Sequence, residues 1–239
     1  MTAAFTTFSP PGKPHIVYHA EYDQGSEAWN KDRLGILTAS NTKLILTPSL
    51  KIADNDKTRS HVWDLLAQRV TQYVEPGFQS YDMERGNFDE EHARNKYSET
   101  YEEVTECGFI TSDKLGFKIG YSPDGLVGDD GLIEIKSRIQ KFQMQTLVES
   151  VAKDEIPAEY LMQVQTGLFV TERKWLDFIS YSGGMLMATV RCYPIPEIQD
   201  AIAVAATKFE QSINEKHAIY NELIASNARL VATERLIYL

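Results

Sequence analysis

The feature that most constrains this chain is a run of short apolar segments in its middle. Residues 108–137 are GFITSDKLGFKIGYSPDGLVGDDGLIEIKS, in which short apolar segments alternate with glycine and Asp-Gly turns. This pattern is typical of consecutive β-strands joined by tight turns. Two more strand-like segments, 175–182 and 186–195, follow after a helical stretch. The chain therefore concentrates its strands in its central part.

Helical patterns lie on both sides of these strands. Helices are predicted over four stretches: 58–74, 83–101, 158–172 and residue 196 onward. Two shorter helices are expected, one capped by Ser26 and one capped by Thr38 or Ser40. The order of helices, strands, helix, strands and helix predicts a mixed α/β fold, in which a central mixed sheet is flanked by helices.

The length of 239 residues and the 43% hydrophobic content predict one domain with a large core. Within it we expect an extended lead-in over 1–20, a core that carries the motifs over 21–180, and a C-terminal helical region over 195–239. No repeat or low-complexity segment interrupts this organisation.

Charge and cysteine content narrow the function classes. The net charge of −10 argues against a protein that simply coats nucleic acid, although a groove with concentrated positive charge can still bind DNA. Only two cysteines are present, and neither is part of a CxxC pair, which argues against a disulfide framework, a structural zinc site and an iron–sulfur cluster. No signal peptide or membrane span is evident, so we expect a soluble, intracellular protein.

Asp124, Glu134 and Lys136 form a candidate site at the end of the strand region. If 115–122 and 132–137 are strands joined by the turn 127–132, Asp124 lies just past the first strand. Glu134 and Lys136 then leave the same face of the second strand, and Ile133 and Ile135 point into the core. The two carboxylates and the Ile135 carbonyl are oxygen ligands of the kind that Mg²⁺ prefers. A neighbouring lysine can orient a water or stabilise developing negative charge.

The same residues also suit an ordinary hairpin. Asp-Gly pairs are common turn chemistry, and we assign Asp129 and Asp130 to the turn. A glutamate and a lysine on one strand face also occur where that face meets solvent, and the spacing does not match an EF-hand loop. The segment by itself leaves the metal site and the charged hairpin equally open.

Four stretches carry a resemblance to known nucleases. Pro123-Asp124 followed by Glu134-Ile135-Lys136 is similar to the PD-(D/E)xK signature of the restriction-endonuclease-like nucleases. The other three stretches are QGSEAWNKDRLGILTASN at 24–41, RGNFDEEHAR at 85–94 and YLMQVQTGLFVT at 160–171. In this order, the four stretches resemble the phage lambda exonuclease family, also called YqaJ-like viral recombinases. Together the four span most of residues 24–180, whereas the C-terminal region matches only as a generic helix.

The resemblance implies a restriction-endonuclease-like core with a C-terminal helical extension. It implies a 5′→3′ exonuclease that uses Mg²⁺, with Mn²⁺ as a substitute, and degrades one strand of linear double-stranded DNA to 5′-mononucleotides. It also implies a homotrimeric ring that threads DNA with free, 5′-phosphorylated ends and leaves the 3′ strand for a single-strand annealing protein in phage-type recombination. The corresponding location is the cytoplasm of a bacterial host, with a phage or prophage gene.

The resemblance assigns roles to the residues of the hairpin. Asp124 and Glu134 correspond to the main metal ligands, together with the Ile135 backbone carbonyl. Lys136 corresponds to the catalytic lysine.

Two helical stretches supply further candidates by resemblance. Glu90 corresponds to the family's active-site glutamate and is another candidate metal ligand, although its spacing to Arg94 also suits a surface ion pair. Gln163 corresponds to the active-site glutamine, and Gln165 is a second choice. The acids next to Glu90, Asp89 and Glu91, are expected to be solvated.

Arg33 and Ser40 correspond to the residues that grip a phosphate in the family. A guanidinium binds phosphate bidentately, and a serine at a helix N-terminus adds a hydroxyl and free N–H groups. The alternative is that Arg33 pairs with Glu27 or Asp32 on the surface and that Ser40 is only a cap. Trp29 is expected in the core.

Three functions follow from these residues. The leading one is the exonuclease, the second is an endonuclease on the same scaffold, and the third is a catalytically silent DNA-binding module. The presence of all four acidic and basic candidates argues against the silent module: Glu90, Asp124, Glu134 and Lys136.

Overall fold

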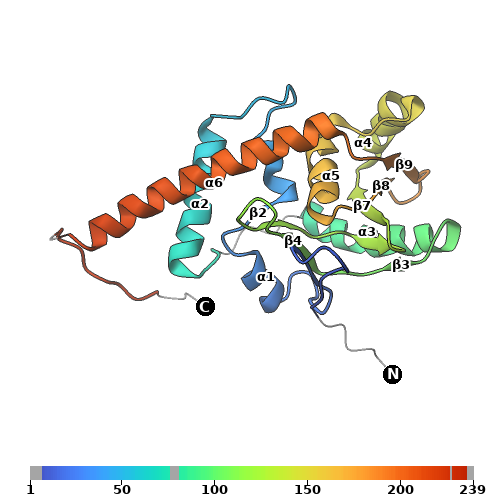
Figure 1. Cartoon of the computed structure of the whole chain (residues 1–239). Helices are drawn as coiled ribbons and strands as arrows, with labels where there is room; N and C mark the ends of the chain where they lie inside the picture. Colours follow the sequence, from blue (N-terminus) through green and yellow to red (C-terminus); the bar gives the residue numbers. More distant parts are fainter. Residues whose placement is uncertain (1–6, 76–80, 227, 236–239) are drawn as a thin grey trace.

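The computed structural model describes residues 7–75, 81–226 and 228–235, which form two β-sheets with helices around them (Figure 1). The strands are β1 (Ile16–His19), β2 (Leu37–Thr38), β3 (Val104–Thr105), β4 (Phe109–Ser112), β5 (Ile119–Tyr121), β6 (Gly125–Val127), β7 (Gly131–Ser137), β8 (Trp175–Tyr181) and β9 (Ala188–Cys192). One sheet has the order β1-β4-β5-β2 and the other β3-β6-β7-β8-β9. Both are mixed, because β2 runs parallel to β5 and β7 parallel to β8.

The helices are α1 (Glu27–Arg33), α2 (Asp56–Thr71), α3 (Tyr81–Thr100), α4 (Gln140–Gln145), α5 (Ala158–Thr171) and α6 (Pro196–Ile224). The 3₁₀ segments η1 (Ala39–Leu44) and η3 (Val151–Lys153) and the π segment η2 (Thr146–Ser150) complete the set. Ser26 caps α1 by accepting from the Trp29 N–H, and Asn55 caps α2. α6 has a proline in its first turn, where the missing N–H costs nothing.

Strand β7 is buried on both faces. On one face, Ile133 and Ile135 pack with Ala93 and Tyr97 of α3. On the other face, Leu132 belongs to a larger core that also contains residues of β5 and α5. Because side chains alternate along a strand, this second face also carries the side chains at positions 134 and 136.

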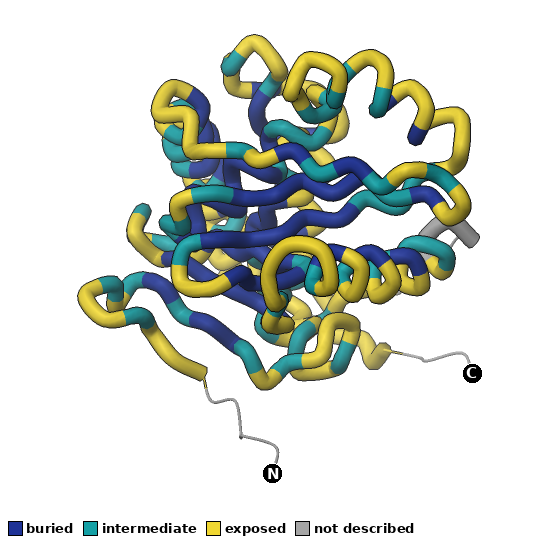
Figure 2. Tube along the Cα trace, turned by 90° about the vertical axis from the view of Figure 1, so that its right-hand side faces the viewer, coloured by how far each residue is buried: buried dark blue, intermediate teal, exposed yellow. Residues whose placement is uncertain are grey.

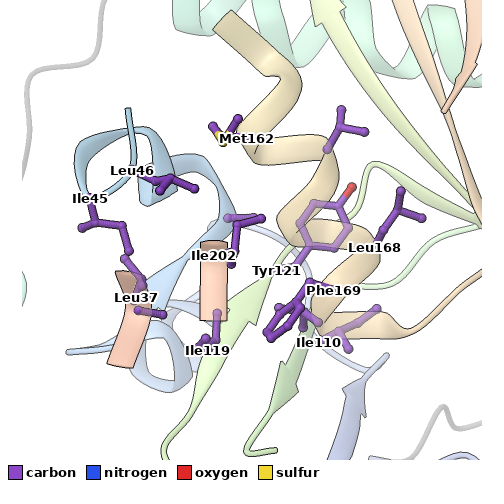
Figure 3. Close-up of a cluster of buried hydrophobic side chains, with 14 of the residues drawn as sticks. Leu37, Ile45, Leu46, Ile110, Ile119, Tyr121, Met162, Leu168, Phe169 and Ile202 are labelled. Atoms are coloured by element: carbon purple, nitrogen blue, oxygen red, sulfur yellow. The ribbon is translucent and has the colours of Figure 1, made fainter. Parts of the chain in front are cut away.

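The larger core joins the four-stranded sheet to η1, α2, α5 and α6. Figure 3 shows Tyr121 of β5 among Ile110, Leu168 and Phe169, with Ile202 of α6 nearby. Figure 2 shows that burial is concentrated in the strands and that the outer turns of the helices are exposed. α6 crosses α2, and its C-terminal end extends away from the sheets (Figure 1).

The predicted mixed α/β class is confirmed, but the central strands are divided between two sheets. β5 belongs to the first sheet, whereas β6, which the sequence pattern does not separate, pairs with β7 across a turn at 128–130. The predicted turn over 127–132 is therefore too long. The chain changes sheets between β5 and β6, where Pro123 has no backbone N–H to continue a ladder.

The ends of the chain also differ from the sequence-based expectations. Residues 16–19 of the predicted lead-in form β1, which pairs with β4, while residues 1–6 lie outside the described part. The predicted helical region over 195–239 is helical to Ile224, and residues 228–235 have no regular secondary structure. The helical segments between residues 140 and 153 were not predicted, because no clear apolar period marks them. No described helix is both long enough and apolar enough to cross a bilayer.

Candidate active site

Glu134 is the centre of a hydrogen-bond cluster on the α5 side of β7. The residue is only 1% exposed. Tyr121 Oη donates to Glu134 Oε2 at 2.7 Å, and Gln163 Nε2 donates to Oε1 at 2.5 Å. Lys136 Nζ donates to the same Oε1 at 2.6 Å. Strands β5 and β7 and helix α5 therefore bring the predicted Glu134, Lys136 and Gln163 together.

Asp124 lies at the edge of β7, in the connection between β5 and β6. Its Oδ2 accepts from the Ile135 backbone N–H at 2.5 Å. In a strand, the N–H and C=O of one residue lie on the same edge, so the Ile135 carbonyl is also on the Asp124 side. The predicted oxygen ligands thus gather at one point, where β6 no longer pairs with β7.

Helix α3 brings Glu90 to the same place. Arg94 Nη2 donates to Glu90 Oε1 at 2.5 Å, which is the ion pair anticipated from their spacing. Arg94 is not confined to the surface, because its Nε donates to the Asp124 backbone carbonyl at 2.8 Å. Its Nη1 also pairs with Glu106 at 3.1 Å. Glu90 therefore both pairs with Arg94 and lies near Asp124, so the two interpretations of Glu90 do not exclude each other.

The three carboxylates act on one another electrostatically. Burial raises the pKa of Asp124 well above its usual range, and the charges of Glu134 and Glu90 raise it further. Burial also raises the pKa of Glu90, against the opposing effect of Arg94. Burial disfavours charged Lys136, but Glu134 and Asp124 outweigh it, so the pKa of Lys136 is raised. The site therefore favours the entry of a cation.

A cavity of about 880 Å³ opens beside this cluster. Glu90, Arg94 and Asp124 line it, together with residues from 20–24 and 104–108. Its volume is within the range of about 300–1,000 Å³ that is common for small-molecule sites. A nucleotide-sized group can therefore reach the carboxylates.

Arg33 and Ser122 form a second polar group next to this cavity. Arg33 Nη1 donates to Ser122 Oγ at 2.8 Å, and the guanidinium lies 4.1 Å from the centre of the Trp29 ring. Trp29 Nε1 donates to Ser122 Oγ at 3.1 Å and to the Gly108 carbonyl at 2.9 Å. The Ser122 oxygen thus accepts two hydrogen bonds, which leaves its own proton to donate outward.

Arg33 has no carboxylate partner in the described part of the chain. Asp32, one of the two surface partners considered from the sequence, pairs with His19 at 3.3 Å instead. Burial lowers the pKa of Arg33 to about 10, because the cation loses water without gaining an anion. A phosphate bound at this position would supply the missing charge.

Ser40 is not part of the Arg33 group. It is exposed at the start of η1, and its Oγ lies 3.3 Å from Thr38 Oγ1. Within the described residues, no contact joins Ser40 to Arg33. The hydroxyl that does contact Arg33 is that of Ser122, which stands two residues before Asp124 but was not predicted as a site residue, because no local pattern marks it.

Two expectations about neighbouring residues are wrong, and the second choice to Gln163 does not reach the site. Asp89 is buried and accepts from Ser137 Oγ at 2.5 Å, because α3 turns it toward the end of β7. Trp29 is half-buried and serves as a platform for Arg33 instead of filling the core. Gln165 is turned away from the site, where it donates to the Tyr193 carbonyl and accepts from the Ile195 N–H.

The donors around Asp124 suit a hard cation. No group of three His, Cys, Asp or Glu side chains within 7–75, 81–226 and 228–235 stands ready to enclose a metal ion. Mg²⁺ does not require such a cage, since it commonly takes one or two carboxylates and fills its octahedron with water and substrate oxygens. The all-oxygen set, with its raised carboxylate pKa values, fits that mode of binding.

The family model of the YqaJ-like viral recombinase domain matches residues 28–174. This chain belongs to that family. The matched range contains all residues of the Glu134 cluster and both members of the Arg33–Ser122 pair. In this YqaJ-like chain, the candidate site therefore lies within the range that the family model matches.

Two solved structures are similar to most of this YqaJ-like chain. An alkaline exonuclease from Laribacter hongkongensis, LHK-Exo, is 29% identical with a TM-score of 0.73, over 84% of this chain and 98% of that chain. The structure of LHK-Exo in complex with dAMP is 30% identical, with the same TM-score and coverage. A comparison with curated proteins gives no match.

Proposed function

We propose that this protein is a metal-dependent exonuclease that degrades one strand of linear double-stranded DNA from its 5′ end to 5′-mononucleotides. The observation that carries the proposal is the convergence of Asp124, Glu134 and Lys136 next to a cavity that Asp124 lines. Arg33, which has no carboxylate partner among the described residues, donates to Ser122 nearby. Family membership and the likeness to LHK-Exo support a nuclease. The dAMP in the LHK-Exo complex is a deoxynucleoside monophosphate, the class of product expected here.

Asp124, Glu134 and the Ile135 carbonyl, with Glu90 near them, would hold Mg²⁺ or Mn²⁺. When bound, the metal supplies a Lewis acid that activates water and offsets charge on the phosphate undergoing attack. The protein's own part is to keep the oxygen ligands in place: Ile135 N–H fixes Asp124, and Tyr121 fixes Glu134.

Lys136 is the group best placed to act on the reacting atoms. Its ammonium is held by Glu134 and stays protonated, because the surrounding carboxylates raise its pKa. A fixed cation of this kind orients the attacking water and stabilises negative charge that develops on the phosphate. Gln163 donates to the same Glu134 oxygen and aligns the carboxylate for both partners.

The Arg33–Ser122 pair suits the 5′-terminal phosphate. Ser122 is two residues before Asp124, so their Cα atoms are at most about 7 Å apart. A phosphate held by Arg33 and Ser122 would therefore lie close to the carboxylates, as release of mononucleotides from a 5′ end requires. Ser40 remains a proposed phosphate contact that would join only when DNA is bound.

The wider role follows from the family and is part of the same proposal. A 5′→3′ activity leaves a 3′ single strand, the substrate of a strand-annealing protein in phage-type recombination. A homotrimeric ring around the DNA would keep the enzyme on its substrate between cuts, and its site of action would be the cytoplasm of a bacterial host.

Digestion of end-labelled DNA tests the activity. Linear duplex with a 5′ or a 3′ label and covalently closed circular duplex are incubated with Mg²⁺, with Mn²⁺ or with EDTA. We expect early release of the 5′ label as mononucleotide, an intact circle and no reaction in EDTA. Rapid loss of the circle would indicate an endonuclease, and binding without any cleavage would indicate a silent DNA-binding module.

A pair of variants tests the site. Asp124→Asn should abolish cleavage and leave DNA binding intact, because only the metal ligand is lost. Asp129→Asn, in the exposed turn between β6 and β7, should cleave like the wild type. Substantial cleavage by purified Asp124→Asn would remove Asp124 from the active site.

A further inference from the structure

Arg138 is an incompletely partnered guanidinium beside the active site. It follows β7 directly, two residues after Lys136, and its side chain is 12% exposed. Its Nη1 donates to Glu159 Oε1 at 2.9 Å and to the Tyr160 hydroxyl. Its Nε is buried without any partner, and within the described residues Nη2 has none either. Buried polar groups in proteins almost always have partners, so this one requires an explanation.

Aromatic rings hold this guanidinium in place. The centres of the Tyr160 and Phe142 rings are each 5.3 Å from Arg138 Cζ. Tyr160 also connects Arg138 to the reacting groups, since Lys136 Nζ lies 5.5 Å from the same ring. Arg138 is therefore a rigid cation one aromatic ring away from the catalytic lysine.

A cavity of about 390 Å³ lies at Arg138, between α4, η2 and the start of α5. Ala158 and Glu159, the first residues of α5, line it, and their backbone N–H groups have no acceptor within the helix. No side chain caps this helix, whose N-cap residue is Pro157. Arg138 and the first residues of α5 thus border one space.

The carboxylates at this cavity restrict what it binds. Glu149 and Glu159 both line it, and Glu159 is already paired with Arg138. Two acids beside one arginine disfavour a small free anion. They are compatible with a phosphate that belongs to a longer chain and is held at other points as well.

We propose that Arg138 binds a backbone phosphate of the DNA strand on the 3′ side of the bond that is cut. This inference rests on the proposed exonuclease function. Three contacts mark a path across the site. Arg33 contacts Ser122, and Asp124 contacts Ile135. Beyond them, the Tyr160 ring lies near both Lys136 and Arg138. A strand whose 5′ phosphate lies at Arg33 and whose first linkage lies at Lys136 continues toward Arg138. Two arginines would then grip the strand on opposite sides of the catalytic centre.

A thermodynamic cycle between protein and DNA tests this contact. Single uncharged methylphosphonate linkages replace the second, third or fourth phosphodiester from the 5′ end of a duplex. Binding to wild type and to Arg138→Met is measured by fluorescence anisotropy in EDTA, so that no cleavage occurs. We expect one linkage to weaken wild-type binding about tenfold and to affect Arg138→Met less than about twofold. Equal effects on both proteins at all three linkages would overturn the proposal.

Three further variants separate binding from folding. Arg138→Lys keeps the charge and most of the packing, and should lose only part of the affinity, since lysine cannot bind bidentately. Arg59→Met removes an exposed positive charge from α2 and should show no linkage-specific effect. Glu159→Gln removes the partner of Arg138 and should leave binding unchanged or tighter. If Glu159→Gln weakens binding as much as Arg138→Met, the arginine has only a structural role.

The proposed function and this inference fail in different ways. If the wild type cleaves linear DNA but the methylphosphonate linkages affect wild type and Arg138→Met equally, only the proposed contact between Arg138 and the DNA backbone is contradicted. A protein that neither binds nor cleaves DNA would contradict both.

Discussion

At the residue scale, the site is built from groups that are not fully neutralised. Glu134 accepts hydrogen bonds from three different side chains, whereas Asp124 is held by one backbone N–H and is surrounded by other acids. Arg33 is half-buried and has no carboxylate partner among the described residues. Such groups cost folding energy in the free protein, and binding of a metal or a phosphate recovers it.

This cost predicts that Asp124→Asn is more stable than the wild type at neutral pH in EDTA. The folded-state pKa of Asp124 is raised, so the folded protein binds its proton more tightly than the unfolded chain. The destabilisation is therefore fully present above the folded pKa and disappears as the pH falls toward the unfolded value. Urea unfolding across the acidic to neutral range should show a gain from Asp124→Asn that shrinks as the pH is lowered.

Added Mg²⁺ should reverse the order of stability. Mass action raises the stability of a wild-type protein that binds the metal, and Asp124→Asn should gain little. Asp129→Asn, in the exposed turn, serves as the control and should follow the wild type in both conditions. A wild-type stability that does not respond to Mg²⁺ would count against the proposed metal site.

Arg33→Met tests the phosphate role at the same scale. The KM for 5′-phosphorylated ends should rise about tenfold, because a charged hydrogen bond is lost, while the KM for 5′-hydroxyl ends changes much less. Lys31→Met, an exposed charge on the same helix, is the matched control. Steady-state kinetics on both kinds of end give the comparison, and equal rises would exclude a terminal-phosphate contact.

At the scale of elements, the candidate active site forms where a strand of each sheet and helix α5 pack against one another. β5 contributes Tyr121, β7 contributes Glu134 and Lys136, and α5 contributes Gln163 between them. α6 supports α5 and α2 from outside through an apolar stripe that ends at Ile213. The remaining turns of that helix contribute no buried side chain among the described residues.

The two parts of α6 should differ in their effect on stability. Ile202→Ala, at a side chain 1% exposed, should cost about 2–5 kcal/mol, because it leaves a cavity in the core. Ile219→Ala, at a position 65% exposed on the same helix, should change the free energy of unfolding by less than about 0.5 kcal/mol. Urea or thermal unfolding measures both, and similar losses would show that the outer half of α6 is also packed in solution.

At the scale of the whole molecule, the negative net charge fits the proposed exonuclease, which would move along DNA between cuts. The charge is −10, yet Arg33, Arg138 and Lys136 lie along the path that we propose for the strand. A chain that is negative overall and positive along one path avoids nonspecific adhesion to DNA.

The proposed ring predicts a trimer in solution. Light scattering should give a mass of about three times the 27.1 kDa of one chain. Exposed apolar residues along α6 such as Val204, Leu223 and Ile224 provide surface for contacts between copies. A stable monomer at working concentration would remove the ring from the proposed function.

The sequence by itself determined the longer helices, the central strand region and the chemistry of most site residues. Alternation along 131–137 predicted that Glu134 and Lys136 share a face and that Ile133 and Ile135 face the core, because a strand has a period of two. Four motifs in order predicted the family and suggested Asp124, Glu90, Gln163 and Arg33 as site residues. These are local patterns, which one chain segment encodes without its neighbours.

Only the tertiary structure decided which residues meet. It placed Ser122 on Arg33, Tyr121 on Glu134 and Asp89 under Ser137, and it left Ser40 apart. It also divided the central strands between two sheets, with Asp124 at the crossing, and left Arg138 beside a cavity without enough partners. These contacts join residues that are far apart in the chain or on different sheets. Because they depend on how the whole core packs, a local sequence pattern cannot predict them.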